Sequence, residues 1–306
     1  MGSVTSGEAH HPVPPSPRHT EAKPVSDAYQ ERLVCTDTED GIRLDGALIS
    51  QLVPTARPIA VVWVHGGGSN FYQPMYVRVG RALAARRLAF ITGNTRGHDY
   101  GSWCEHADGT SFLGGVAWER LEDARRDVAA WVRFAAEQGG HRVALAGHSL
   151  GALKALAYQA EHADPRVLGL ALISPPLRPE WDTGRYPDLL AQAEQLVTDG
   201  KADELLTGPW IRLSARTLLS THRFDLDQFG RARPDAPIGR VRCPVLAIIG
   251  TNEPSIGLPD DLEALRRNAQ AAPQVELRVL EGADHSYTGK EEELAEVLAD
   301  WVVGLV

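Results

Sequence analysis

The sequence predicts an α/β fold, a mostly parallel eight-stranded sheet flanked by helices. From about residue 30, short runs rich in β-branched residues alternate with helical stretches. The run Ile59–Val64 is apolar throughout, which is typical of a central parallel strand covered on both faces. A further apolar run, residues 142–146, leads directly into residues 147–151. That segment has a glycine at each end, and a helical stretch follows it.

The strands are predicted from apolar and β-branched runs bounded by turn-forming residues. Residues 31–35 and 42–49 form an opening pair, joined by the turn at residues 39–41. The remaining strands are expected at residues 59–64, 88–92, 142–146, 167–174, 244–250 and 275–280.

Helices are predicted where apolar residues recur at three- and four-residue steps, as they do between residues 121 and 135. That amphipathic helix is expected to pack on the sheet. Residues 94–115 are expected to form a long glycine-rich loop, and such loops are often functional. Further helices are expected at residues 76–87, 150–163, 262–271 and 294–301.

The predicted organisation is one core with an insertion. Residues 27–174 and 243–306 make the core, while residues 175–242 interrupt the alternation of strands and helices and have helical character. They therefore predict a helical cap, inserted after the sixth strand. Residues 1–26 are rich in Pro, Ser and His and are expected to be a disordered tail.

Composition argues against several functional classes. A net charge of −9 with scattered basic residues is unlike a nucleic-acid or anionic-membrane surface. No stretch approaches the roughly 18 apolar residues of a membrane span. Cys35, Cys104 and Cys243 lie far apart without a CxxC pair, unlike a disulfide framework or a zinc site. We expect a cytoplasmic protein with no metal, cofactor or nucleic-acid partner, and the sequence does not indicate its oligomeric state.

The run Gly147-His148-Ser149-Leu150-Gly151 matches the pattern GxSxG. A strand-to-helix turn of this kind is so tight that only small residues fit around the serine. It raises the hydroxyl group above the sheet, at a helix N-terminus whose dipole favours developing negative charge. The flanking strand and helix argue against the alternative of an ordinary glycine-rich turn. Ser149 is therefore the predicted nucleophile.

On these motifs the chain from about residue 30 onward resembles the α/β-hydrolase superfamily, in its lid-bearing branch of serine hydrolases and esterases. The resemblance implies a histidine beyond the last strand, and residues 282–286, Gly-Ala-Asp-His-Ser, match that pattern. His285 is therefore the expected general base, which takes a proton from Ser149 and returns it to the leaving group.

The resemblance also implies a carboxylate after the strand at residues 244–250, where the family usually has Asp. Glu253 fits by position and chemistry, because either carboxylate can hold the imidazole tautomer and stabilise the imidazolium. A surface glutamate is the alternative interpretation. Asp284 is expected to face away from the base, and Asp260 and Asp261 resemble a helix start, although they are the next candidates.

The run His65-Gly66-Gly67-Gly68 follows a predicted strand, where the family places part of its oxyanion hole. We assign one donor to the backbone N–H of Gly67 and the other to that of Leu150. Related patterns differ in register by one residue, so the choice among these glycines stays open.

The segment 175–242 carries enough aromatic and apolar residues to roof a pocket, and a hydrophobic acyl or ester substrate is expected. The alternative is that these residues only attach the cap to the core. Candidate substrate contacts are Gly68, His148, Trp181 and Trp210.

A more distant resemblance, to hydrolases related to fungal siderophore-ester hydrolases, rests on three features. These are the turn at residues 94–99, the pair Gly114-Gly115 and Lys154. Arg96 within that turn is expected to tie loops together. Lys154 has two interpretations, a partner for a buried acid or, as its Ala- and Leu-rich helix favours, a surface residue.

The predicted function is a cofactor-independent serine hydrolase that cleaves a carboxylic ester or thioester through an acyl-enzyme. Acyl transfer, cyclisation or carbon–carbon hydrolysis with the same triad is one alternative, and a non-catalytic binding protein on this fold is another. The usual epoxide hydrolases and dehalogenases need Asp in place of Ser149. A metallohydrolase of the HExxH type lacks its motif here.

Overall fold

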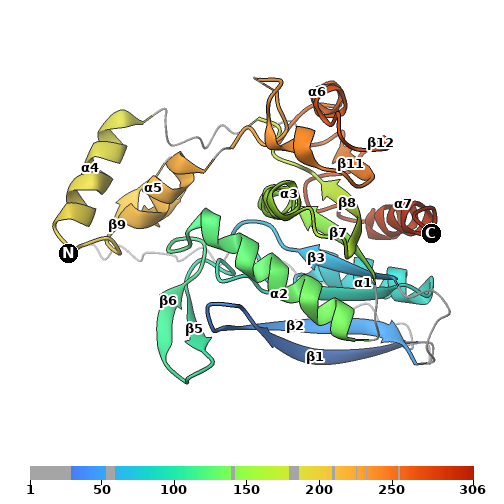
Figure 1. The fold of residues 1–306 in the computed structure, drawn as a ribbon, viewed down its shortest axis with the longest axis horizontal. Coiled ribbons are helices and arrows are strands. Elements are labelled where there is room, and N and C mark those ends of the chain that lie inside the picture. The colour runs from blue at the N-terminus through green and yellow to red at the C-terminus, as the bar shows by residue number, and fades with distance from the viewer. Residues whose placement is uncertain are drawn as a thin grey trace, which may run out of the picture.

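The computed structural model describes residues 29–52, 59–138, 142–178, 186–208, 211–224, 226–231, 233–253 and 256–306. The expected tail at residues 1–26 lies outside these ranges. A twisted sheet lies between two helical layers, and α4, α5 and β9 lie together, apart from α1 and α7 (Figure 1).

Over the described residues the sheet has ten strands, in the order β12-β11-β8-β7-β3-β4-β2-β5-β6, with β1 paired to β2 outside this path. Strands β12 to β4 of this order pair in parallel, and the remaining pairs are antiparallel. The strands are β1 (Tyr29–Asp37), β2 (Ile42–Gln51), β3 (Ile59–Val64), β4 (Ala89–Gly93), β5 (Ser102–His106), β6 (Ser111–Gly114), β7 (Arg142–His148), β8 (Val167–Ile173), β11 (Val245–Gly250) and β12 (Val275–Leu280).

The mostly parallel sheet flanked by helices is confirmed, and each of the eight predicted strands is present. The sheet is larger than predicted because β5 and β6 form an antiparallel hairpin within the expected loop at residues 94–115. The residues of β5, Ser-Trp-Cys-Glu-His, are mostly polar and lie at the edge of the sheet, so they lack the apolar pattern of a buried strand.

The helices form two layers on opposite faces of the sheet. Val62 and Val64 of β3 face the layer of α2, α3 and α6, whereas Val61 and Trp63 face α1 and α7. None of the helices within the described ranges is long and apolar enough to cross a bilayer. The helices are α1 (Pro74–Ala85), α2 (Ala124–Glu137), α3 (Leu150–His162), α4 (Pro187–Thr198), α5 (Ala215–Arg223), α6 (Asp261–Asn268) and α7 (Glu291–Val303), with short 3-10 helices η1 (Leu121–Asp123) and η3 (Pro237–Arg240).

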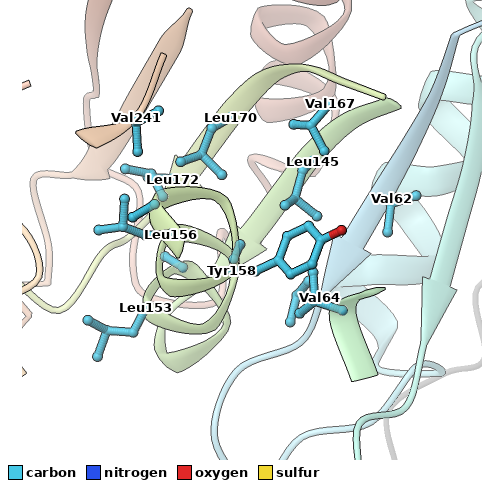
Figure 2. Packing of buried hydrophobic residues seen from close by; sticks show 14 of the residues in the cluster. Val62, Val64, Leu145, Leu153, Leu156, Tyr158, Val167, Leu170, Leu172 and Val241 are labelled. Atoms are coloured by element: carbon cyan, nitrogen blue, oxygen red, sulfur yellow. The ribbon is translucent and has the colours of Figure 1, made fainter. Parts of the chain in front are cut away.

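The layer built around α3 holds the strand end that carries the candidate nucleophile. In Figure 2, the side chain of Tyr158 extends from α3 toward Val62 and Val64 of β3. Leu145 of β7 belongs to the same buried cluster, as does Leu156 of α3. Because β3, β7 and α3 share one packed core, the segments that follow β3 and β7 are fixed relative to each other.

Between β8 and β11 the chain forms α4, α5, η3 and a small antiparallel hairpin of β9 (Leu205–Thr207) and β10 (Arg212–Ser214). Helices α4 and α5 share an apolar cluster of their own, which includes Ala193 and Leu218. The Leu121 N–H donates to Ser220 Oγ at 2.8 Å, which ties α5 to η1 in the core.

Trp131 of α2 packs against two glycines of the sheet. Its side chain is 2% exposed, and its Nε1–H donates to Asn94 O at 2.9 Å. A Cβ at Gly93 would lie 2.0 Å from the indole ring, and a Cβ at Gly46 would lie 2.6 Å from it. The indole therefore occupies the space that side chains at these positions would fill.

We predict that Gly93→Ala lowers the free energy of unfolding by about 1–3 kcal/mol, because the new methyl group overlaps the Trp131 ring. The matched control is Gly304→Ala, whose Cβ would come no closer than 3.3 Å to a neighbouring atom. Urea unfolding followed by circular dichroism measures both variants. Equal stability of the two variants would contradict this account of the packing.

Candidate active site

Ser149 lies directly between β7 and α3, with a backbone φ of 55° and ψ of −124°. Non-glycine residues seldom adopt this conformation, and it persists only where the surrounding structure enforces it. The Ser149 N–H donates to Ile173 O, and Ser149 O accepts from the Ala152 N–H, each at 2.9 Å. The turn therefore joins β8 and the first turn of α3 through its own backbone.

The two glycines of the turn are required by close backbone approaches. A Cβ at Gly147 would lie 2.3 Å from Gly151 O, and a Cβ at Gly151 would lie 2.2 Å from Val64 O. A larger residue at Gly151 would push the turn away from the end of β3, and one at Gly147 would push it away from the start of α3. The GxSxG pattern thus reflects close backbone contact with the neighbouring strand end and with the following helix.

His285 and Glu253 contact each other at the ends of neighbouring parallel strands, β12 and β11. His285 Nδ1 lies 2.8 Å from Glu253 Oε2, and the Glu253 side chain is 1% exposed. Glu253 Oε1 accepts from the Gly250 N–H at 2.5 Å and from Ser174 Oγ at 2.8 Å. Because a carboxylate can only accept, the Nδ1 of His285 carries the proton and its Nε2 is left as an acceptor.

Two other carboxylates that the sequence offered as partners of His285 bind other groups. Asp284 Oδ1 accepts from the backbone N–H groups of Ser286 and Thr288, at 3.0 Å and 2.9 Å. Asp261 begins α6 and forms an ion pair with Arg178 at 2.7 Å. Asp260, the N-cap residue of α6, precedes it. Among the described residues, only the carboxylate of Glu253 contacts the His285 ring.

The His285 side chain is 37% exposed, so it is open to a ligand. Within the described residues the Ser149 hydroxyl makes no hydrogen bond. Contacts between a nucleophile and its base are often long until a substrate binds.

His148 is not a substrate contact, because it is buried and both of its ring nitrogens bind protein atoms. Its Nε2–H donates to the carbonyl oxygen of His285 at 2.9 Å. Burial lowers the pKa of His148 to about 3, so the ring is neutral and Nδ1 is an acceptor. Tyr76 O–H donates to that Nδ1 at 3.0 Å and accepts from the Gly66 N–H at 3.0 Å. This chain of hydrogen bonds links the glycine-rich loop after β3 to the loop of His285, through Tyr76 of α1 and His148 at the end of β7.

Ser149 lines a cavity of about 560 Å³, within the range of small-molecule sites. Trp181 and Trp210 lie outside the described residues, whereas Gly67 and Gly68 are part of the wall. The apolar part of the wall includes Val116, Leu121, Leu150, Pro176, Ile211, Leu213 and Ile256.

Gly67 and Leu150 lie next to each other, beside the turn that carries Ser149. A Cβ at Gly67 would lie 3.1 Å from Leu150 Cδ2. The Leu150 N–H belongs to the first turn of α3 and has no acceptor within the helix. The Gly67 N–H has no acceptor in the described part of the chain. Gly68 has a φ of +63°, which glycine adopts without strain.

Lys154 is buried in an ion pair with Glu119, so its interpretation as a surface residue is wrong. Lys154 Nζ lies 2.6 Å from Glu119 Oε2, and the two side chains are 0% and 1% exposed. Burial raises the pKa of the Glu119 carboxyl above its usual range, while Lys154 acts in the opposite direction. Glu119 also lines the cavity. Sequence reasoning missed Glu119, since no local motif surrounds it, and a lysine on an apolar helix was the one available signal.

Arg96 connects the loop after β4 to α2 and to the turn after β1. Its guanidinium donates to Asp127 at 2.8 Å and to Asp40 at 2.9 Å. Burial opposes ionisation of Asp40, but the hydrogen bonds from Arg96 and Thr38 and the positive charge of Arg96 together outweigh it and lower the pKa of Asp40 to about 2. This pairing fixes the loop that continues to Gly97, beside Glu119.

Three solved structures share the fold at low sequence identity. Est1E from Butyrivibrio proteoclasticus, bound to ferulic acid, is 17% identical with a TM-score of 0.63, over 89% of this chain and 98% of its own. The esterase Pf2001 from Pyrococcus furiosus is 17% identical with a TM-score of 0.58, over 92% and 96%. The hypothetical protein PA2218 from Pseudomonas aeruginosa is 16% identical with a TM-score of 0.68, over 94% and 99%.

No curated protein matches the sequence significantly. The model of the alpha/beta hydrolase family matches residues 61–297, which include the serine turn and both partners of the histidine–glutamate contact. From this match, together with the fold, it follows that the chain belongs to the alpha/beta hydrolase family.

Proposed function

We propose that the protein is a serine esterase that cleaves a carboxylic ester or thioester through an acyl-enzyme. Ser149 is the nucleophile, His285 the general base, and Glu253 the group that orients the base. The main support is the 2.8 Å contact between His285 Nδ1 and a buried, fully hydrogen-bonded Glu253 carboxylate. That contact leaves Nε2 of His285 free to accept a proton.

In the first half of the reaction, His285 Nε2 takes the proton from the Ser149 hydroxyl as Oγ attacks the carbonyl carbon. The carbonyl oxygen becomes an oxyanion, which the N–H groups of Gly67 and Leu150 bind. Removing one such donor typically costs about 2.7–4 kcal/mol of transition-state stabilisation. The intermediate then expels the alcohol or thiol, which receives the proton from His285.

In the second half, water attacks the acyl-enzyme. His285 takes a proton from the water, and the resulting intermediate releases the carboxylic acid as the proton returns to Ser149 Oγ. Each cycle consumes one ester and one water and yields one acid and one alcohol. No cofactor enters this sequence.

The segment 175–242 acts as a cap over the substrate in this proposal. Ile211 and Leu213 line the cavity from the β9–β10 hairpin region, which supports this role. The apolar wall favours a hydrophobic acyl or alcohol group in a small-molecule substrate. A cytoplasmic location also belongs to the proposal, consistent with the absence of disulfides among Cys35, Cys104 and Cys243.

Ser149→Ala and His285→Ala are each predicted to lower kcat by roughly 10⁴- to 10⁶-fold, because neither half-reaction can proceed. The assay uses p-nitrophenyl esters of graded acyl length. Ser111→Ala and His222→Ala, both at exposed positions, are matched controls that should keep wild-type kcat. Turnover retained in a folded Ser149→Ala protein would reject this mechanism.

Glu253→Gln is predicted to lower kcat by roughly 10³- to 10⁴-fold while the protein stays folded. Two donors, the Gly250 N–H and Ser174 Oγ, hold the amide oxygen, so the amide nitrogen faces His285. The amide N–H then donates to Nδ1, the ring proton moves to Nε2, and His285 cannot accept from Ser149.

The matched control for this variant is Glu281→Gln, at an exposed position. Steady-state kinetics and thermal melting on both variants separate a catalytic defect from unfolding. Wild-type kcat in Glu253→Gln would mean that another group orients the base.

A further inference from the structure

Glu119 holds an unpartnered carboxylate oxygen in the wall of the cavity that contains Ser149. Its Oε2 pairs with Lys154 Nζ at 2.6 Å, but its Oε1 has no hydrogen-bond partner within the described residues. The side chain is 1% exposed, so bulk water does not reach it. A buried acceptor without a donor is costly, which makes a donor on a bound ligand favourable.

The surroundings of Glu119 are built to hold this carboxylate in place. Lys154 fixes Oε2 and also donates to Thr95 Oγ1 at 3.4 Å. Gly97 leaves the necessary space, because a Cβ there would lie 1.9 Å from Glu119 Oε2. Lys154 belongs to α3, the helix that begins directly after Ser149, so one helix positions both the nucleophile turn and the cation.

The charge balance identifies the chemistry of the ligand group. Lys154 already neutralises Glu119, and most other residues of the wall are apolar. A cationic ligand would bring an additional, uncompensated charge into this cavity, at a high desolvation cost. A neutral hydroxyl group supplies one donor at no charge cost, and a hydrogen bond to an ionised acceptor is a strong one.

We propose that Glu119 Oε1 accepts a hydrogen bond from a hydroxyl group of the substrate, so that the enzyme selects hydroxylated esters. This inference rests on the proposed esterase function and names its substrate class. Glu119 is then a specificity-determining residue, whereas the bond-breaking chemistry stays with Ser149 and His285.

The test compares kcat/KM for pairs of esters that differ in one group. One series consists of methyl esters of hydroxyphenyl-alkanoic acids, and a second of hydroxyphenyl-alkyl acetates, with chain length and ring position varied. In each matched compound a methoxy group replaces the hydroxyl group. We expect at least one hydroxylated ester to be preferred by about 10- to 100-fold, the effect of one hydrogen bond to a charged group.

Two variants locate the origin of this preference. In Glu119→Gln the amide oxygen pairs with Lys154 and the amide nitrogen replaces Oε1, so methoxy compounds, which only accept, should gain relative to hydroxyl compounds. If the uncompensated positive charge of Lys154 prevents folding of this variant, the double variant Glu119→Leu/Lys154→Met removes both charges together, a change that proteins often tolerate. In the double variant, kcat/KM should then be about equal for the two members of each pair. Glu105→Gln, at an exposed position, is the control and should keep the wild-type ratio.

The outcomes separate the two proposals. If wild type hydrolyses neither p-nitrophenyl esters nor any ester of either series, or if hydrolysis survives in Ser149→Ala, the proposed function itself fails. If wild type hydrolyses p-nitrophenyl esters but no ester of either series, or hydrolyses both members of every pair equally, the function stands and the role of Glu119 is rejected. A hydroxyl preference that persists in the folded double variant would also reject it, because the hydroxyl group would then bind elsewhere.

Discussion

The left-handed backbone of Ser149 is the constraint on which the rest of the site depends. A φ of 55° at a non-glycine residue is unfavourable, and the packed ends of β3 and β7 enforce it. Gly147 and Gly151 allow this because their backbones touch atoms that side chains would displace. The same turn places Ser149 and Leu150 in the wall of one cavity, so that in the proposed mechanism the nucleophile and an oxyanion donor come from a single turn.

His148 extends that constraint to His285. Its neutral ring donates to the His285 carbonyl and accepts from Tyr76, which in turn holds the Gly66 N–H. Displacing the loop of His285 or the glycine-rich loop would leave one of these buried polar groups without its partner, which is costly. The His148 side chain therefore positions the loop of His285 and the glycine-rich loop together, although it does not line the cavity.

Local patterns predicted the strands and the serine turn because burial and tight turns restrict which residues fit there. The meeting of Glu253 and His285 could be anticipated from topology, since each follows one of two neighbouring parallel strands. The hairpin β5–β6 was not predicted, because its residues are mostly polar and lie at a sheet edge. Glu119 was not predicted, and a buried acid as the partner of Lys154 was only the less favoured interpretation, because their pairing depends on how α3 packs against a distant loop. His148 was misassigned for the same reason, as its partners are remote in sequence.

Intact-mass analysis after treatment with a fluorophosphonate probe is the most direct test of the central claim, that Ser149 is an activated nucleophile. The account predicts a single adduct on the wild-type protein and none on Ser149→Ala. An adduct that persists on Ser149→Ala would place the reactive group elsewhere. A folded wild-type protein that forms no adduct would contradict the claim and favour a ligand-binding protein on the same fold.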